Sequence, residues 1–272
     1  MELLHLDAGA GRIGQRFCVY HAVTSGSPVR GALVYVHPFG EEMNKARRMA
    51  ALQARRFAAA GYAVLQIDLA GCGDSSDELR DVAWEDWIED VLLALHHLRA
   101  RVSAPLWLWG ARFGAPLATE AAGRFNEPLR LLLWQPVTSG AAVLAQLLRL
   151  QAAAAITNGA RSPAAATTRE ALAGGQSLEV AGYELPGPLA LRFDQARLTL
   201  PRGTPACVWL EVSTADEPRL LPGSSKVIDS WKADSSAVTA RAVQGPAFWQ
   251  TVEIEEAPAL IDATLDAVEA SG

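Results

Sequence analysis

The sequence predicts an α/β fold, a mainly parallel sheet of about eight strands with helices on both faces and a cap insertion. Apolar runs of strand length alternate with longer helical patterns, and continuous apolar strands are typical of parallel sheets covered on both faces. Half of the 272 residues are hydrophobic, which is enough to bury a large core. We therefore expect one α/β unit built around this sheet.

The first elements follow from hydrophobic periodicity. Residues 15–23, QRFCVYHAV, alternate apolar and polar side chains as a half-exposed strand does. Residues 31–37, GALVYVH, are continuously apolar and predict a buried strand. Apolar residues at helical spacing then fill 42–60, and Gly61 fits the C-terminal cap of that helix.

In the middle of the chain, predicted strands and helices again alternate. Residues 62–75 predict a buried strand that runs into a Gly-rich loop. Residues 84–101 carry an apolar stripe, with acids in the first turn and arginines in the last, as suits a helix dipole. Residues 105–110 predict the next buried strand, and a helix of small residues begins shortly after it.

The last strands are separated from the others by an unusual segment. We expect buried strands at 129–137 and 206–212 and an edge strand at 237–243. Residues 138–200 are first Ala-rich and helical and then rich in Gly and Pro. Ligands bind at the carboxyl edge of open α/β sheets, so an insertion here predicts a cap over that edge. We expect residues 1–137 and 201–272 to form the core and 138–200 the cap.

Composition and charge narrow the possible partners. The net charge is −6, so the chain lacks the basic surface that nucleic-acid binding requires. Three isolated cysteines, Cys18, Cys72 and Cys207, predict neither a disulfide framework nor a metal site, and we expect no metal and no cofactor. The start of the chain lacks a signal-peptide pattern, and no apolar run is long enough for a transmembrane segment. We expect a cytoplasmic protein.

Residues 106–122, LWLWGARFGAPLATEAA, have the outline of a nucleophile elbow. In such a turn the middle residue of Gly-x-Ser-x-Gly is held between a strand and a helix and points into an active site. Here the middle residue is Arg112. Its guanidinium stays protonated and cannot attack a carbonyl, which excludes nucleophilic catalysis from this position.

Three short motifs in order resemble the α/β-hydrolase superfamily. HPFG at 37–40 lies where such proteins supply an N–H group to the oxyanion hole, DLAGCGDS at 68–75 lies where many have a Gly-rich loop, and GARFG at 110–114 is the elbow. A longer set of segments resembles the proteins called exosortase A system-associated hydrolase 2: residues 37–76, LLLWQPV, SLEVAGYEL and GPAFWQTVEIEEAPALI. This resemblance implies a bacterial exosortase and exopolysaccharide context, and it supplies no established reaction.

The other members of a catalytic triad are sparse in the chain. The base normally follows the last core strand, where this sequence reads VQGPAFWQT, and the last histidine of the chain is His97. Asp216 stands near the usual position of the acid, although it can also belong to an ordinary turn or cap the helix that precedes Trp231. His37 can act chemically or brace a turn, and Ser139 is a candidate displaced nucleophile that would need an adjacent base.

Two interpretations of Arg112 stay open. It can bind an anionic ligand beside a helix N-terminus, or it can form an internal ion pair with Glu41, Glu42 or Asp216. The sequence predicts that the following residues lie in or beside the former active site, in ligand-binding or structural roles: His37, Phe39, Glu41, Glu42, Ala111, Arg112, Phe113, Gln135, Asp216 and Trp249.

The functional prediction has two forms. The first is a hydrolase-like protein without serine-hydrolase catalysis, which binds an unknown small molecule, anionic or linked to a glycan or lipid, or a protein partner. The second is an active hydrolase or acyltransferase for ester or acyl substrates, which uses a displaced nucleophile or a water activated by His37 or an acid. We expect no nucleic-acid partner in either case.

Overall fold

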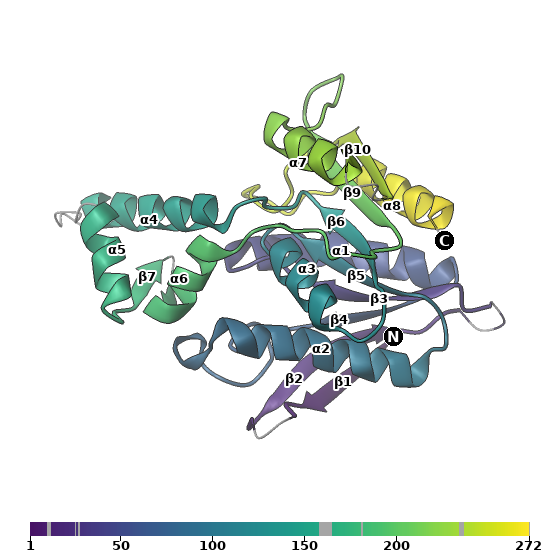
Figure 1. Ribbon diagram of the computed structural model, residues 1–272, viewed down its shortest axis with the longest axis horizontal. Coiled ribbons are helices and arrows are strands. Elements are labelled where there is room, and N and C mark those ends of the chain that lie inside the picture. The colour runs from purple at the N-terminus through teal and green to yellow at the C-terminus, as the bar shows by residue number, and fades with distance from the viewer. Residues whose placement is uncertain are drawn as a thin grey trace.

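A mixed eight-stranded sheet forms the centre of the protein (Figure 1). The computed structural model describes residues 1–9, 12–24, 26, 28–157, 165–180, 182–233 and 237–271. The strand order is β1-β2-β4-β3-β5-β6-β9-β10. The strands are β1 Glu2–Asp7, β2 Gln15–His21, β3 Gly31–Val36, β4 Tyr62–Ile67, β5 Leu106–Ala111, β6 Arg130–Trp134, β9 Cys207–Ser213 and β10 Val238–Gln244.

Strand pairing confirms the predicted mainly parallel sheet. All the neighbouring strands from β4 to β10 pair in parallel, whereas β2 pairs antiparallel with β4 and β1 antiparallel with β2. The strand expected at 237–243 lies at the edge, as β10. β1 is an additional strand at the opposite edge, and its mostly exposed side chains explain the absence of an apolar run that would predict it.

Helices cover both faces of the sheet. One face packs against α2 Trp84–Arg101, α3 Gly114–Arg124 and α7 Pro222–Ala233, and the other packs against α1 Glu41–Ala59 and α8 Pro258–Ala270. The bounds of α2 are those predicted from its apolar stripe and terminal charges. Gly61, just after α1, has a positive φ of 95°, which agrees with its predicted role at the helix end.

An insertion separates β6 from β9 and lies beyond the carboxyl ends of the strands (Figure 1). It contains α4 Gly140–Thr157, α5 Ala165–Ala173, a hairpin of β7 Leu178–Val180 and β8 Tyr183–Leu185, and α6 Gly187–Gln195. α4 and α6 pack against each other, and α6 also packs on α5. Residues 158–164 and residue 181 of the predicted cap fall outside the described residues. Its assignment as a separate cap stays a prediction.

Within the described ranges, no helix combines the length and apolar character needed to cross a membrane.

Candidate functional site

The turn between β5 and α3 has the backbone geometry of a nucleophile elbow. Arg112 has φ 52°, in the left-handed region that side chains other than glycine rarely adopt. A Cβ on Gly114 would lie 2.3 Å from the carbonyl oxygen of Val36, and one on Gly110 would lie 2.6 Å from Cα of Ala115. The two glycines therefore permit the tight strand-to-helix turn that displays residue 112.

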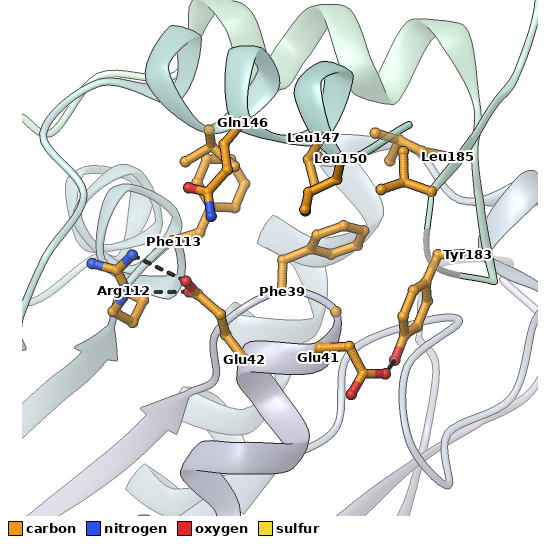
Figure 2. Close-up of a pocket in the computed structure, with 13 residues that line it drawn as sticks. Phe39, Glu41, Glu42, Arg112, Phe113, Gln146, Leu147, Leu150, Tyr183 and Leu185 are labelled. Atoms are coloured by element: carbon orange, nitrogen blue, oxygen red, sulfur yellow. Dashed lines mark hydrogen bonds and ion pairs between the residues drawn. The ribbon is translucent and has the colours of Figure 1, made fainter. Parts of the chain in front are cut away.

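The Arg112 guanidinium forms a two-pronged ion pair with Glu42 (Figure 2). Nε donates to Oε2 at 3.1 Å and Nη2 donates to Oε1 at 3.0 Å, while Nη1 donates to the carbonyl oxygen of Gln135 at 3.3 Å. The guanidinium also lies over the ring of Trp249, 4.8 Å from its centroid. These contacts occupy three donors of Arg112 and neutralise its charge inside the protein.

Of the three predicted acidic partners, Glu42 is the one that pairs with Arg112. Glu41 instead accepts a hydrogen bond from the hydroxyl of Tyr183 at 3.1 Å. Asp216 is exposed, and Gln244 donates to its Oδ1 at 3.4 Å. Adjacent residues Glu41 and Glu42 thus have different partners because they point in different directions from the first turn of α1 (Figure 2).

His37 joins two loops at the carboxyl edge of the sheet. Its Nδ1 donates to the carbonyl oxygen of Pro38 at 2.6 Å, and its Nε2 accepts from the N–H of Leu69 at 3.2 Å. This network assigns the neutral tautomer with the proton on Nδ1. Burial lowers the pKa of His37, which favours the same neutral form. Both ring nitrogens therefore serve the backbone, in the bracing role that the sequence left open.

The other candidates for chemistry lie apart from Arg112. Ser139 is half-buried, pairs through its backbone with Arg197, and is not part of the crevice wall described below. Burial raises the pKa of the Cys72 thiol to about 12, so little thiolate forms near neutral pH. Among the described residues, no group of three or more His, Cys, Asp or Glu side chains is arranged to hold a metal ion.

A crevice with a cavity volume of about 120 Å³ lies between the elbow and the insertion. Phe39, Glu41, Glu42, Arg112 and Phe113, all predicted site residues, line its core side. The insertion supplies the opposite wall with side chains of α4 and the β7–β8 hairpin: Val143, Gln146, Leu147, Leu150, Val180, Tyr183 and Leu185. Figure 2 shows Leu147 and Leu150 above Phe39. The walls are mainly apolar, with the ion pair at one side and the Glu41–Tyr183 contact at another.

Three further predicted residues lie on the other side of Arg112. Ala111, Gln135 and Trp249 line a small cavity of about 10 Å³ between the elbow and α8. Gln135 has φ 40°, and its side-chain Oε1 accepts a hydrogen bond from the N–H of Val212 at 2.8 Å. These residues support Arg112 and its turn rather than the wall of the crevice. Trp249 comes from the loop after β10, where a triad base would be expected.

Sequence reasoning did not name the insertion residues of the crevice. Three of them, Val143, Leu147 and Leu150, follow the i, i+4, i+7 spacing of one helix face, which is a readable signal in α4. Tyr183 meets Glu41 across a large sequence separation, and no local pattern indicates that contact.

Comparison with known proteins identifies the family. Residues 27–172, more than half of the chain, match the family described as serine aminopeptidase, S33. The chain belongs to this α/β-hydrolase family. A comparison with curated proteins found no match.

Solved structures of α/β hydrolases share the fold of this family member. Est1E from Butyrivibrio proteoclasticus with ferulic acid bound aligns with a TM-score of 0.65 at 14% identity, over 98% of this chain and 99% of that chain. A soluble variant of monoglyceride lipase from Saccharomyces cerevisiae, in complex with a substrate analogue, aligns with a TM-score of 0.63 at 15% identity, over 99% and 94%. At these identities the similarity establishes the fold.

Proposed function

We propose that this α/β-hydrolase-like protein binds a neutral ligand with an apolar chain, of acyl or lipid type, in the crevice and lacks serine-hydrolase catalysis. The observation that carries the proposal is the pairing of Arg112 with Glu42 beside mainly apolar walls. An arginine at the nucleophile position cannot form an acyl-enzyme, and its partner removes the free positive charge that an acidic ligand would need.

The charges around the crevice select against an anion. Glu41 and Glu42 contribute two negative charges and Arg112 one positive charge, so the wall carries a formal charge of −1. A carboxylate or phosphate entering the crevice would have to compete with Glu42 for the guanidinium. Among an acidic small molecule, a lipid or glycan precursor and a protein partner, a neutral lipid-type chain therefore agrees best with these walls.

We further propose that residues 138–200 act as the cap of this site. The apolar residues of α4 and of the β7–β8 hairpin would cover the ligand chain, while Phe39 and Phe113 would contact it from the core. The resemblance to exosortase-associated proteins suggests that such a neutral, lipid-type ligand would come from the context of exopolysaccharide synthesis.

The rival function, an active hydrolase or acyltransferase, has less support from the geometry. Water activation by His37 requires a free ring nitrogen, and both of its nitrogens contact the backbone. Ser139 and Asp216, the other candidates, lie outside the crevice wall.

Calorimetric titration with 1-octanol tests the proposed ligand class. We expect the alcohol to bind in the crevice and the variant Leu147→Trp, which fills the space above Phe39, to abolish that binding. Arg149→Trp is the matched control, because Arg149 is exposed on the same helix and does not line the crevice. Equal affinity of wild-type protein and Leu147→Trp for 1-octanol would contradict the proposal.

A further inference from the structure

A second cavity, of about 250 Å³, lies between α1 and the sheet on the β1 side of the molecule. It shares no lining residue with the crevice. Its floor comes from β2, β4 and β3, where Val19, Gln66 and Tyr35 are cross-strand neighbours in one row. Its wall is a stripe of α1 that includes Met43, Arg47, Ala51 and Arg55. We call this cavity the α1 groove.

The floor of the α1 groove carries a hydroxyl that the protein itself does not satisfy. Tyr35 is 5% exposed, and its ring packs on Trp109 with centroids 4.4 Å apart. No hydrogen bond of its hydroxyl occurs among the described residues. Tyr35 lines the groove, so its hydroxyl can donate a hydrogen bond to a polar group of a ligand there.

Two neighbouring side chains add further donors. Gln66 uses Oε1 in a contact with Nε2 of His21 at 3.1 Å, which leaves its NH₂ group without a partner among the described residues. Arg55 is exposed and has no ion pair in the described part of the chain. A ligand in the α1 groove would therefore meet a hydroxyl, an amide NH₂ and a guanidinium, which together suit an oxygen acceptor.

The charge of the α1 groove is opposite to that of the crevice. Arg47 and Arg55 contribute two positive charges, and Asp68, which pairs with Arg47 at 3.0 Å, contributes one negative charge. These side chains leave one excess positive charge, which favours an anion over a neutral ligand. Phe17, Val19 and other apolar side chains of the lining would contact an uncharged chain.

We propose that the α1 groove is a second binding site, which takes a small carboxylate with a short apolar chain. The carboxylate accepts hydrogen bonds from the Tyr35 hydroxyl, the Gln66 amide and Arg55, and the chain lies along α1 against Met43. This site is independent of the function proposed for the crevice, because the two cavities have different walls and opposite charges.

Methyl NMR on protein labelled at its three methionines tests the proposal with octanoate as the probe. Met43 lines the α1 groove, whereas Met49 is fully buried in the core and serves as the internal reference. We expect octanoate to shift the Met43 methyl signal in a saturable manner, 1-octanol to act at least about tenfold more weakly because it lacks the charge, and the Met49 signal to stay in place.

Substitutions of Arg55 and Tyr35 test whether the shift of the Met43 signal depends on the proposed contacts with the carboxylate. Arg55→Gln should raise the Kd for octanoate about fivefold or more, and Tyr35→Phe, which removes only the hydroxyl, about threefold. Arg56→Gln is the matched control, because Arg56 lies next along α1, pairs with Asp262 and does not line the groove. Leu147→Trp, which blocks the crevice, should leave the Met43 response unchanged.

Three results would overturn this proposal: an unshifted Met43 signal, equal affinity for 1-octanol and octanoate, or the same Kd in Arg55→Gln as in Arg56→Gln.

Discussion

Arg112 and Glu42 form the ion pair at the elbow. The side chains of the pair are 19% and 25% exposed, so water still reaches the charges in part. Removing one partner from a fully buried pair typically costs 3–5 kcal/mol, and partial exposure reduces that penalty. The pair therefore contributes to local stability and also fixes the guanidinium away from the apolar walls.

The variant Glu42→Gln should lower the free energy of unfolding by about 1–3 kcal/mol, because Arg112 then keeps its charge with a weaker partner. Urea unfolding measures this change. Glu41→Gln is the control, since Glu41 bonds Tyr183 on the surface, and we expect its effect to stay within about 0.5–1 kcal/mol. Identical unfolding midpoints for the two variants would show that the ion pair is not a specific stabilising contact.

The pH dependence of stability should report on His37. Burial lowers its pKa in the folded protein, whereas the unfolded chain titrates near 6.5. As the pH falls below that value the unfolded state takes up a proton that the folded state resists, so the free energy of unfolding decreases. His21 and His97, whose pKa values burial also lowers, add to this slope.

His37→Gln should therefore show a smaller loss of stability between about pH 7 and pH 5 than wild-type protein. Urea unfolding at several pH values measures the two slopes. A slope in His37→Gln as steep as in wild-type protein would indicate that His37 is free to take a proton in the folded state.

The geometry of the elbow between β5 and α3 depends on the glycine at position 114. Gly114 approaches the carbonyl oxygens of Val36 and His37, and neither oxygen can move without displacing the end of β3. The turn thus keeps its form although residue 112 has no nucleophile, because the glycines serve the packing of α3 on the sheet.

Gly114→Ala should destabilise the protein by about 2–3 kcal/mol, since its Cβ would meet backbone atoms at 2.3 and 2.5 Å. Gly123→Ala, on the same helix, is the control: no atom lies within 4 Å of the added Cβ, and a helical Ala is favoured over Gly by about 0.5–1 kcal/mol. Thermal unfolding should separate the two variants in opposite directions. Equal midpoints would argue against a steric requirement at the elbow.

Local patterns predicted most elements of the fold. α2 was predicted with its bounds because its stripe and terminal charges are both encoded within one stretch. The arginine at the elbow position and the lack of any histidine after His97 are also readable in the sequence. β1 was not located, because a short, exposed edge strand lacks an apolar run.

The sequence could not predict that Arg112 pairs with Glu42 rather than with Glu41 or Asp216. This pairing depends on the direction of side chains in the first turn of α1 relative to a turn 70 residues away. The sequence predicts a cap, but it does not identify Leu147 or Tyr183 as residues of the cap that line the crevice, because these contacts also join segments far apart in the chain.

At the scale of the whole molecule, one sheet supports two cavities of opposite charge. The crevice lies at the carboxyl edge under the insertion, whereas the α1 groove lies on the β1 side of the sheet. A neutral chain and a carboxylate are therefore expected to bind independently, so filling the crevice with 1-octanol, at concentrations too low to shift the Met43 signal itself, should leave the Met43 response to octanoate unchanged.

The most direct test of the central claim is the intact mass of purified protein after incubation with a fluorophosphonate, which labels activated serine nucleophiles. Because Arg112 occupies the elbow and both His37 nitrogens contact the backbone, we expect the mass to remain that of the unmodified chain. A serine hydrolase such as a carboxylesterase, labelled under the same conditions, is the positive control. Stoichiometric addition of one phosphonyl group to this protein would contradict the claim that it binds its ligand without serine-hydrolase catalysis.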